Sequence, residues 1–357
     1  MTDERINLIV LFGGQSAEHD VSCVTAAHVL RAVDQQRYRI TPVGISREGE
    51  WVLATNALEA LSDTALAMPE RLIAAGDALS PTPMLATAQA FGPVVVLPLL
   101  HGPLGEDGTV QGLLELLDVP YVGSGVLGSA VSMDKAVAKE LCAFHGFPQA
   151  RWMSVREHEV SDARLAAVVE LLGLPVFVKP SNMGSSVGVS KAASIDELRV
   201  AVEHALSYDE TVVIEEAIVG REIEVAVLGN LQPQASVPGE IVPGKDFYDY
   251  ADKYLDDGAQ LLIPAPLNET ETAAVRSLAI RVYQALRCEG LARVDFFYEQ
   301  GGRGFLINEA NTMPGFTPIS MYPKMWQESG VSYSELVNQL IELALERHHR
   351  RRRNTSH

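Results

Sequence analysis

Arg293-Val-Asp295-Phe-Phe, followed by Asn308-Glu309-Ala-Asn311-Thr-Met-Pro-Gly315, is the most informative stretch of this chain. The runs at 296–298 and 305–307 are rich in β-prone residues, and the glycines between them predict a hairpin. Side chains alternate faces along a strand, so Glu309 and Asn311 are expected to point the same way. Pairing about the turn then places Asp295 roughly opposite Glu309.

Asp295, Glu309 and Asn311 would together offer three oxygen ligands on one surface. Mg²⁺ takes one or two carboxylates from a protein and completes its shell with water and substrate phosphates. A solvated hairpin face is the alternative interpretation of the same residues. Arg293 lies two residues before Asp295 and therefore on the same strand face, where a cation beside metal ligands indicates an anionic reaction centre.

The composition is that of an ordinary globular protein, with 357 residues and 47% hydrophobic residues, a length that allows two or three domains. The net charge is −18, although five arginines (347 and 350–353) lie in the last eleven residues. An acidic body of this kind repels nucleic acid, so we expect no nucleic-acid partner. We expect the arginine-rich terminus to be a frayed, solvated tail.

Cys23, Cys142 and Cys288 are odd in number and far apart, which predicts neither a disulfide framework nor a zinc site. The N-terminus lacks the apolar stretch of a signal peptide. The continuous apolar run at 94–97 ends at Pro98 and is far too short to span a membrane. These features predict a cytoplasmic protein with no membrane partner.

Apolar patterning predicts an α/β layer with a mainly parallel sheet over the first 120 or so residues. The expected elements are strands at 6–12, 38–45 and 93–99 and a helix at 21–33, with helix and loop at 55–90. One long helix is predicted at 130–145. Further strands are expected at 174–179, 188–191, 211–216 and 222–228, then a helix that starts at the capping box Asn268–Glu271, and a last helix at 334–347.

Three glycine-rich segments are candidates for a nucleotide-binding loop. Residues 123–128 match GxGxxG, but no Asp or Glu occurs at 142–156, where a dinucleotide site needs an acidic residue. Residues 239–246 miss the P-loop pattern because Asp246 replaces the Ser or Thr, and a mobile lid over 246–257 is the better interpretation. Residues 179–188 combine Lys179 with a Gly-Ser loop that could close over phosphates, or form a plain surface turn.

Taken together, the motifs closely resemble those of D-alanine:D-alanine ligases, which are ATP-grasp enzymes. The motifs, in order, are Gly13-Gly-Gln-Ser-Ala-Glu18-His-Asp-Val-Ser22, Leu100-His101-Gly-Pro-Leu-Gly-Glu-Asp-Gly-Thr109, Met133-Asp-Lys135, Lys179 with Gly184-Ser-Ser-Val-Gly188, Asp252-Lys253-Tyr254, Arg293-Val-Asp295 and Asn308–Gly315. The resemblance covers residues 6 to about 345 in the expected order.

The resemblance implies an ATP-grasp architecture that is α/β in the N-terminal part and α+β in the C-terminal half. The expected parts are a Rossmann-like N-terminal substrate domain (1–133), a central ATP-grasp lobe (134–228), a C-terminal lobe with metal ligands and lid (229–347), and a basic tail (348–357). ATP would lie between the central and C-terminal lobes. A homodimer is also implied.

The resemblance also implies an ATP site that binds two Mg²⁺ ions, or Mn²⁺, through Asp295, Glu309 and Asn311. Lys135 and Lys179 would contact phosphates under the loop 184–188. The full set of implied ATP-binding residues is Lys135, Lys179, Gly184, Ser185, Ser186, Val187, Gly188, Glu215 at the adenine amino group, Ile218 through its backbone, Glu222 at the ribose, and Lys253.

The implied reaction is ATP-dependent joining of two D-alanines through an acyl phosphate, for the synthesis of peptidoglycan precursors. Glu18 would pair with the ammonium group of the first alanine, in a pocket that His101 also lines. Ser185 and Tyr254 would form hydrogen bonds with Glu18 and close the lid over the site. Arg293 and the amide of Gly315 would stabilise the oxyanion. Lys253, Ser320 and the Met321 backbone would bind the carboxylate of the second alanine.

Rival interpretations remain open at this point. Another ATP-grasp ligase could use D-lactate or D-serine as acceptor, although Tyr254 favours an amine over a hydroxyl. Ile319 departs from the polar residue that the family often has before the serine, which leaves the second subsite in doubt. An NAD-dependent oxidoreductase built on 123–128 and a non-catalytic binding protein are the alternatives from other classes.

Overall fold

The structure is a computed structural model that describes residues 5–62, 68–90, 92–242 and 260–352, and these residues form three β-sheets. The N-terminal sheet has the order β4-β3-β2-β1-β5. Its centre is parallel, as predicted: β1 (Ile6–Gly13) pairs with β2 (Tyr38–Ile45) on one side and with β5 (Val94–Pro98) on the other. Strand β3 (Trp51–Ala54) pairs antiparallel with β2, and the edge strand β4 (Gly76–Ala78) pairs antiparallel with β3.

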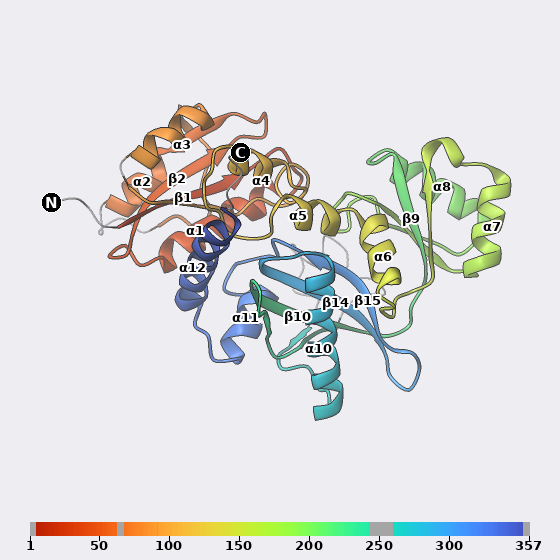
Figure 1. Ribbon diagram of the computed structural model, residues 1–357. Coiled ribbons are helices and arrows are strands. Elements are labelled where there is room, and N and C mark those ends of the chain that lie inside the picture. The colour runs from red at the N-terminus through yellow and green to blue at the C-terminus, as the bar shows by residue number, and fades with distance from the viewer. Residues whose placement is uncertain (1–4, 63–67, 91, 243–259, 353–357) are drawn as a thin grey trace, which may run out of the picture.

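Helices cover the N-terminal sheet (Figure 1). They are α1 (His19–Ala32), α2 (Thr55–Ser62), α3 (Pro81–Ala90) and α4 (Thr109–Leu116). The side chains of Ile9, Leu11 and Val96 are fully buried beneath them, as expected for a central parallel strand pair that is covered on both faces. Helix α1 starts two residues earlier than the helix predicted at 21–33, and β4 was not predicted within 55–90.

The long helix predicted at 130–145 is wrong as a single element. Two helices occur instead, α5 (Val126–Met133) and α6 (Lys135–Phe144). Asp134 separates them because it adopts extended backbone angles and its carboxylate accepts a hydrogen bond from the amide of Val137 at 3.1 Å. The same carboxylate oxygen accepts from the Ser181 hydroxyl at 2.7 Å. An N-cap tied to a distant loop was not visible in the apolar periodicity.

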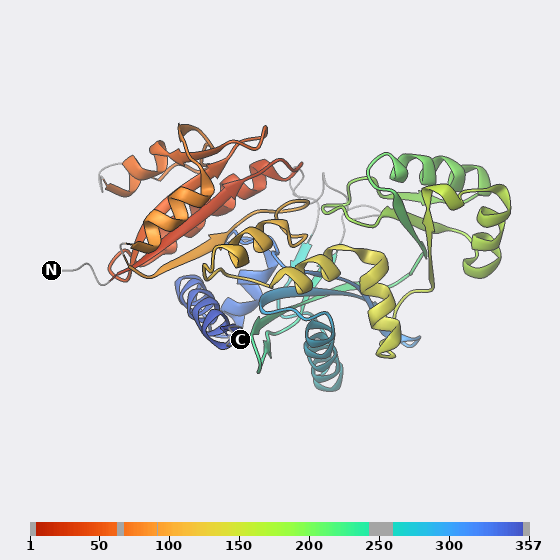
Figure 2. The same cartoon turned by 45° about the horizontal axis from the view of Figure 1, so that its top comes forward.

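The central sheet has the order β6-β9-β7-β8 and is entirely antiparallel. Its strands are β6 (Trp152–Arg156), β7 (Val176–Pro180), β8 (Ser190–Ala192) and β9 (Thr211–Glu216), with the short 3₁₀ turn Glu157–Glu159 after β6. Helices α7 (Asp162–Leu172) and α8 (Ile195–Leu206) pack on it around a core of their own that includes Leu165, Val178 and Leu198. This lobe stands apart from the N-terminal domain in Figures 1 and 2.

The third sheet has the order β13-β12-β10-β14-β15, with β11 paired to β10. Its strands are β10 (Arg221–Gly229), β11 (Gln234–Ala235), β12 (Gly239–Val242), β13 (Gln260–Leu262), β14 (Gly290–Glu299) and β15 (Gly304–Asn311), and α10 (Glu269–Ala285) and α11 (Met321–Glu328) cover it. The predicted capping box is confirmed, because Asn268 and Glu271 exchange hydrogen bonds at 2.9 Å each. Since β10 pairs with β14 along its length, we propose to end the central lobe before Arg221 rather than at residue 228.

The C-terminal helix α12 (Tyr333–Arg351) corrects the prediction of a frayed basic tail after residue 347. It lies beside α1 (Figure 1), and Leu336, Leu340 and Ile341 share a core with residues of the N-terminal sheet. Several ion pairs anchor its last turns: Arg350 with Glu289, Arg351 with Glu115, and both His348 and Arg352 with Asp118. Residues 353–357 of the predicted tail lie outside the described residues.

Arg347 is the most buried charged residue of this helix, with 2% of its surface exposed. Its guanidinium carbon lies 3.9 Å from the ring centroid of Tyr121, and Nη2 donates to the Tyr121 carbonyl oxygen at 3.1 Å. We expect Arg347→Met to lower the free energy of unfolding by about 2 kcal/mol, because it removes a buried cation–π contact and a hydrogen bond.

Urea unfolding of the two proteins would measure this loss. Arg352→Met is the matched control, since Arg352 pairs with Asp118 at the surface with 63% of its side chain exposed. We expect that control to change stability by less than about 0.5 kcal/mol. Equal effects of the two substitutions would contradict a special anchoring role for Arg347.

Candidate active site

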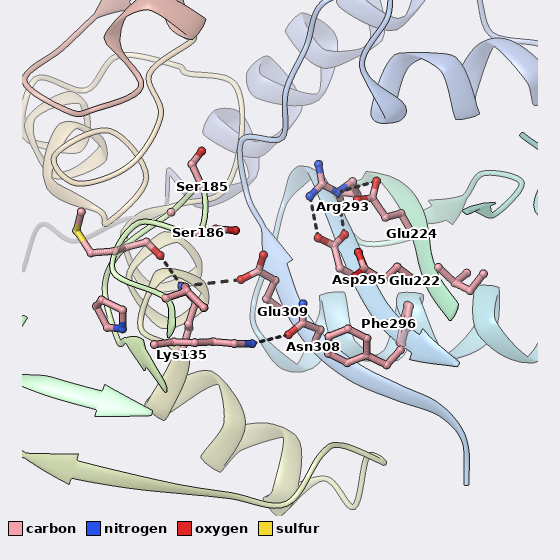
Figure 3. Close-up of a pocket in the computed structure, with 17 residues that line it drawn as sticks. Lys135, Ser185, Ser186, Glu222, Glu224, Arg293, Asp295, Phe296, Asn308 and Glu309 are labelled. Atoms are coloured by element: carbon pink, nitrogen blue, oxygen red, sulfur yellow. Dashed lines mark hydrogen bonds and ion pairs between the residues drawn. The ribbon is translucent and has the colours of Figure 1, made fainter. Parts of the chain in front are cut away.

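The candidate active site is a cleft between the central lobe and the third sheet, shown in Figure 3. Strand β7 and the loop after it form one wall, and β10, β14 and β15 form the other. The residues that line it are Lys135, Lys179, Pro180, Met183, Gly184, Ser185, Ser186, Val189, Glu222, Ile223, Glu224, Arg293, Asp295, Phe296, Phe297, Asn308 and Glu309. Many of the polar residues predicted from separate parts of the sequence therefore meet in one place.

The predicted pairing of the hairpin β14–β15 is confirmed. Asp295 lies opposite Glu309, and Arg293 lies opposite Asn311, so all four side chains belong to one face of the sheet. The amide nitrogen of Asn311 donates to Asp295 Oδ2 at 2.9 Å. Two carboxylates and one amide are thus gathered on the cleft side of the hairpin.

A β-bulge changes the direction of Asn308, which the sequence did not predict. The register passes from Asp295–Glu309 directly to Phe296–Ile307, so Asn308 is the extra residue of β15. Strict alternation would point Asn308 away from Glu309, yet both line the cleft. Asn308 Oδ1 accepts a hydrogen bond from Lys179 Nζ at 3.1 Å, which joins the two walls.

Arg293 lies between two carboxylates (Figure 3). Its Nε and Nη2 donate to the two oxygens of Asp295 at 2.8 and 2.7 Å, and Nε lies 3.1 Å from Glu224 Oε2. Burial lowers the pKa of Arg293, but the charges of Asp295 and Glu224 outweigh it and hold that pKa well above its usual value. Sequence reasoning missed Glu224, although strand alternation places it on the same face of β10 as Glu222.

The donor set fits a hard divalent cation. Asp295 and Glu309 supply carboxylate oxygens and Asn311 supplies an amide oxygen, which is the number of protein ligands that Mg²⁺ accepts while keeping sites for phosphate. Among the described residues no group of three or more His, Cys, Asp or Glu side chains is placed to hold a metal. Lys135 Nζ, 3.8 Å from Glu309 Oε2, adds a cation for an anionic ligand beside this set.

Lys135 and Lys179, the two lysines predicted to bind phosphates, both line the cleft but belong to different elements. Lys135 begins α6 and donates to the Met183 carbonyl oxygen at 2.5 Å. Lys179, near the end of β7, donates to Glu215 Oε2 at 2.9 Å. Burial lowers the pKa of Lys179, but Glu215 and Glu309 outweigh it, so the pKa is raised and the lysine stays charged.

Glu215, predicted to contact adenine, is not among the residues that line the cleft. It is buried, with 3% of its surface exposed, and its carboxylate pairs with two lysines. Its second oxygen, Oε1, lies 2.8 Å from Nζ of Lys139, a buried residue that sequence reasoning missed. Burial alone would raise the pKa of Glu215, but Lys139 and Lys179 lower it to about 2. Ile218 and Glu222 occupy the segment that leads from β9 into β10, and Glu222 lines the cleft.

The loop 183–188 crosses from the central lobe to the N-terminal domain. The Ser185 hydroxyl donates a short hydrogen bond to Glu18 Oε1, and a Cβ on Gly184 would lie 3.0 Å from Glu18 Oε2. Ser185 and Ser186 have φ angles of 49° and 60°, which are costly for residues other than glycine and often mark functional sites. Val187 donates to the Gly184 carbonyl oxygen at 3.0 Å within the same turn, which Gly188 ends.

His101 joins the N-terminal domain to the loop after β15. Its Nδ1 lies 3.0 Å from the Met313 carbonyl oxygen, and burial lowers its pKa although the charge of Glu18 opposes this. Glu106, which sequence reasoning missed as a site residue, accepts from the amides of Gly102 at 2.7 Å and Met313 at 3.1 Å. Burial, and then the charge of Glu18, raise the pKa of Glu106 to about 8.

Ser320 and Gly315 lie close together after β15, because a Cβ on Gly315 would be 3.2 Å from Ser320 Oγ. The Ser320 hydroxyl also accepts from the Thr317 amide at 3.1 Å. Met321 is the first residue of α11, so its amide has no partner within the helix, while its side chain is buried in the core. Lys253, Tyr254 and the predicted lid at 246–257 lie outside the described residues.

The two rival glycine segments are explained by packing and strand formation. A Cβ on Gly128 would lie 2.4 Å from the Arg287 carbonyl oxygen, and one on Gly290 would lie 3.0 Å from the Gly123 amide nitrogen. The segment 123–128 therefore packs closely against the start of β14. Residues 239–242 form strand β12 rather than the start of a phosphate loop.

No helix of the described residues has the length and apolar character needed to cross a bilayer. Comparison with known proteins gives a consistent result over most of the chain. Residues 7–124 match the family described as D-ala D-ala ligase N-terminus, and residues 141–342 match D-ala D-ala ligase C-terminus.

Individual relatives cover nearly all of the chain. A D-alanine–D-alanine ligase of Bacillus licheniformis is 48% identical over 354 residues, which is 96% of this chain and 97% of that protein. D-alanine–D-alanine ligase A of Chromobacterium violaceum is 47% identical, with 96% of both chains covered.

Solved structures of similar proteins have the same fold. The D-alanine-D-alanine ligase of Coxiella burnetii superposes with a TM-score of 0.81 at 34% identity, covering 97% of this chain and 96% of that one. The VanG D-Ala:D-Ser ligase of Enterococcus faecalis gives 0.80 at 32% identity, covering 96% of this chain and all of the other. The chain has the ATP-grasp fold expected from its motifs, and it belongs to the D-alanine–D-alanine ligase family.

Proposed function

We propose that the protein joins two D-alanine molecules into D-alanyl-D-alanine, using ATP and releasing ADP and phosphate. The observation that carries this proposal is the contact of Ser185 with Glu18, because it closes the glycine loop of the ATP lobe onto the N-terminal domain. Lys135, Lys179 and the Asp295–Glu309 pair lie on the same cleft. A phosphate-binding wall and a pocket for an ammonium group therefore adjoin each other.

ATP is proposed to lie in the cleft between β7 and β14. Lys135 and Lys179 would bind its phosphates, with Gly184, Ser185, Ser186, Val187 and Gly188 above them, and Ile218 and Glu222 would face the nucleoside. Asp295, Glu309 and Asn311 would hold two Mg²⁺ ions, or Mn²⁺, which when bound neutralise charge on the phosphates. Glu215 supports this site through Lys179, and Lys253 is proposed to join it from the lid.

The first D-alanine is proposed to lie between Glu18 and His101, with its ammonium group on Glu18. Its carboxylate oxygen attacks the γ-phosphorus of ATP, and the bond from that phosphorus to the β-phosphate oxygen breaks. ADP is released, and the alanine becomes an acyl phosphate. The enclosed position of Glu18, which is 9% exposed, supports the pocket because an acyl phosphate must be kept from water. Tyr254 of the lid is proposed to complete this enclosure.

The second D-alanine is proposed to bind through its carboxylate to Ser320, the Met321 amide and Lys253. Its deprotonated amine attacks the acyl carbon, a C–N bond forms, and inorganic phosphate leaves from the tetrahedral intermediate. Arg293 and the Gly315 amide are the proposed donors to the oxyanion. Arg293 suits this role because Asp295 and Glu224 hold its guanidinium in a fixed orientation.

ADP release in the presence of D-alanine, L-alanine, D-lactate and D-serine tests the proposal. We expect release that requires both D-alanine and Mg²⁺, with no stimulation by L-alanine. D-serine is the second candidate acceptor, because the VanG D-Ala:D-Ser ligase shares the fold and Ile319 is 75% exposed beside Ser320. Faster release with D-alanine plus D-serine or D-lactate than with D-alanine alone would favour that alternative. Folded protein that binds ATP but releases no ADP with any of them would overturn the assignment.

Glu18→Gln is expected to raise the KM for D-alanine at the first subsite by about a hundredfold, because an amide cannot form the ion pair with the ammonium group. ATP affinity should change little, since the amide oxygen of a glutamine can still accept the hydrogen bond from Ser185. Steady-state kinetics with each substrate varied in turn would measure both. Asp20→Asn, which removes a surface carboxylate of α1 that pairs with Arg47, is the control. An unchanged KM for D-alanine would contradict the proposed role of Glu18.

A homodimer, which the family resemblance implies, stays a prediction for this chain, and size-exclusion chromatography with light scattering would test it.

A further inference from the structure

Lys139 is a buried charge for which the reaction scheme has no use. It lies on α6 with 3% of its surface exposed, and it is not among the residues that line the cleft. Its Nζ lies 2.8 Å from Glu215 Oε1. Two ions removed from water in this way are expensive, so a hydrophobic pair could have filled the space between α6 and β9 at least as well.

The second oxygen of Glu215, Oε2, links the buried Lys139–Glu215 pair to the cleft. Glu215 Oε2 accepts from Lys179 Nζ at 2.9 Å, so a single carboxylate lies between two lysines. Lys179 faces the cleft and also donates to Asn308 Oδ1. The three side chains together carry one net positive charge, and Lys179 is the member of the three that lines the cleft.

Without Lys139 the net charge of this group of side chains would differ. Glu215 and Lys179 alone would form a neutral buried pair, and the carboxylate would draw the lysine away from an anionic ligand. With Lys139 present, Glu215 still positions Lys179, and Lys139 neutralises the charge of Glu215 from the side away from the cleft. The low pKa of Glu215, about 2 against burial that alone would raise it, agrees with a carboxylate held ionised by both lysines.

We propose that Lys139 is a positioning residue for nucleotide binding: it neutralises Glu215 so that Lys179 keeps a net positive charge toward the phosphates. The proposal rests on the proposed use of ATP by this cleft. It differs from a purely structural role, in which Lys139 would only attach α6 to β9 and its loss would affect every ligand equally.

Three variants separate the two roles. Lys139→Met removes one cation and leaves Glu215 facing Lys179 alone. Lys139→Met combined with Glu215→Gln removes both buried partners and restores one net positive charge to the site. Lys191→Met removes an exposed lysine from β8 of the same lobe, and it controls for the change in total charge.

The measurement is the Kd of ATP and of adenosine for each protein by calorimetry, without D-alanine. We expect Lys139→Met to weaken ATP binding by about tenfold or more, because one unit of charge is lost beside the phosphates, and to leave adenosine binding unchanged. The double variant should bind ATP more tightly than Lys139→Met does, because one net positive charge is restored. Any loss through an adenine contact of Glu215 should appear equally in the Kd of adenosine. Lys191→Met should not change either Kd.

Several results would overturn the proposal. These are an unchanged ATP Kd in Lys139→Met, an equal loss of ATP and adenosine affinity, or a double variant at least as weak as the single one. If Lys139→Met does not fold, the double variant carries the test alone, since it leaves no buried carboxylate without a second partner. A loss of ATP affinity no greater than the loss of adenosine affinity supports the proposal, and an ATP-specific loss of about tenfold overturns it.

The parent protein separates this inference from the proposed function. If the parent binds ATP and ligates D-alanine, but the variants give any of the contradicting results named above, only the role proposed for Lys139 is wrong. If the parent does not bind ATP, the proposed function fails first.

Discussion

Asp295→Ala is expected to lower turnover by about 10³-fold or more while leaving the protein folded. Asp295 binds Arg293 through both carboxylate oxygens, accepts from Asn311, and lies opposite Glu309. Its removal therefore takes away a proposed metal ligand and the group that orients the oxyanion donor. Glu309→Ala should have a similar effect, since Glu309 is the second carboxylate of the set.

Glu299→Ala is the matched control for both changes. Glu299 is also a carboxylate on β14, but it pairs with Arg303 at the far end of the strand, outside the cleft. Turnover should stay near that of the parent protein, and thermal unfolding should show all three variants folded. Parent-like turnover in both Asp295→Ala and Glu309→Ala would rule out the proposed metal site.

Arg293→Lys is expected to lower kcat by about 10²- to 10³-fold with little change in the KM for ATP. A lysine keeps the positive charge, but its ammonium group cannot bind both oxygens of Asp295 and contact Glu224 together. The charge that stabilises the oxyanion would then be less well oriented. Since the oxyanion exists only in the reaction, the loss should fall on kcat rather than on substrate binding.

Arg221→Lys offers a chemically matched control. Arg221 lies on β10 of the same sheet and binds both oxygens of Glu240 at 2.8 and 2.7 Å, but it does not line the cleft. Both substitutions break a bidentate pair, so both should lower stability by comparable amounts. An equal loss of kcat in the two variants would mean that Arg293 acts only through folding.

The hairpin that carries the proposed metal ligands could be predicted from sequence because two periodic signals agreed. Strand alternation and the glycines of the turn were enough to place Asp295 opposite Glu309 and Arg293 on the same face as Asp295. The place of Asn308 could not be predicted in this way. It depends on a β-bulge, and a bulge is set by the contacts of both strands rather than by a local sequence signal.

Two errors in the predicted helices have the same physical origin. The break at Asp134 depends on a capping carboxylate that also bonds to Ser181, far along the chain. The C-terminal helix continues to Arg351 because its arginines contact the N-terminal domain: Arg347 contacts Tyr121, and Arg351 pairs with Glu115. Tertiary contacts of this kind override local composition, which indicated a long helix in one case and a solvated tail in the other.

Glu106 and Lys139 were missed for a different reason. Each is a charged residue in a segment typical of an ordinary loop or helix. Lys139 gains significance from its burial, and Glu106 gains it from its contacts with the Gly102 and Met313 amides. Lys139 had one available signal, because it lies four residues after Lys135 and therefore on the same face of α6. Burial could not be inferred from that spacing, since lysines four residues apart are also common on solvated helices.

The most direct test of the proposed reaction is to follow ¹³C-labelled D-alanine to product by mass spectrometry, with ADP measured in the same sample. We expect D-alanyl-D-alanine and ADP to form in a one-to-one ratio, both requiring Mg²⁺ and both absent with L-alanine. ADP formed without dipeptide, or no dipeptide from folded protein that binds ATP, would contradict the account.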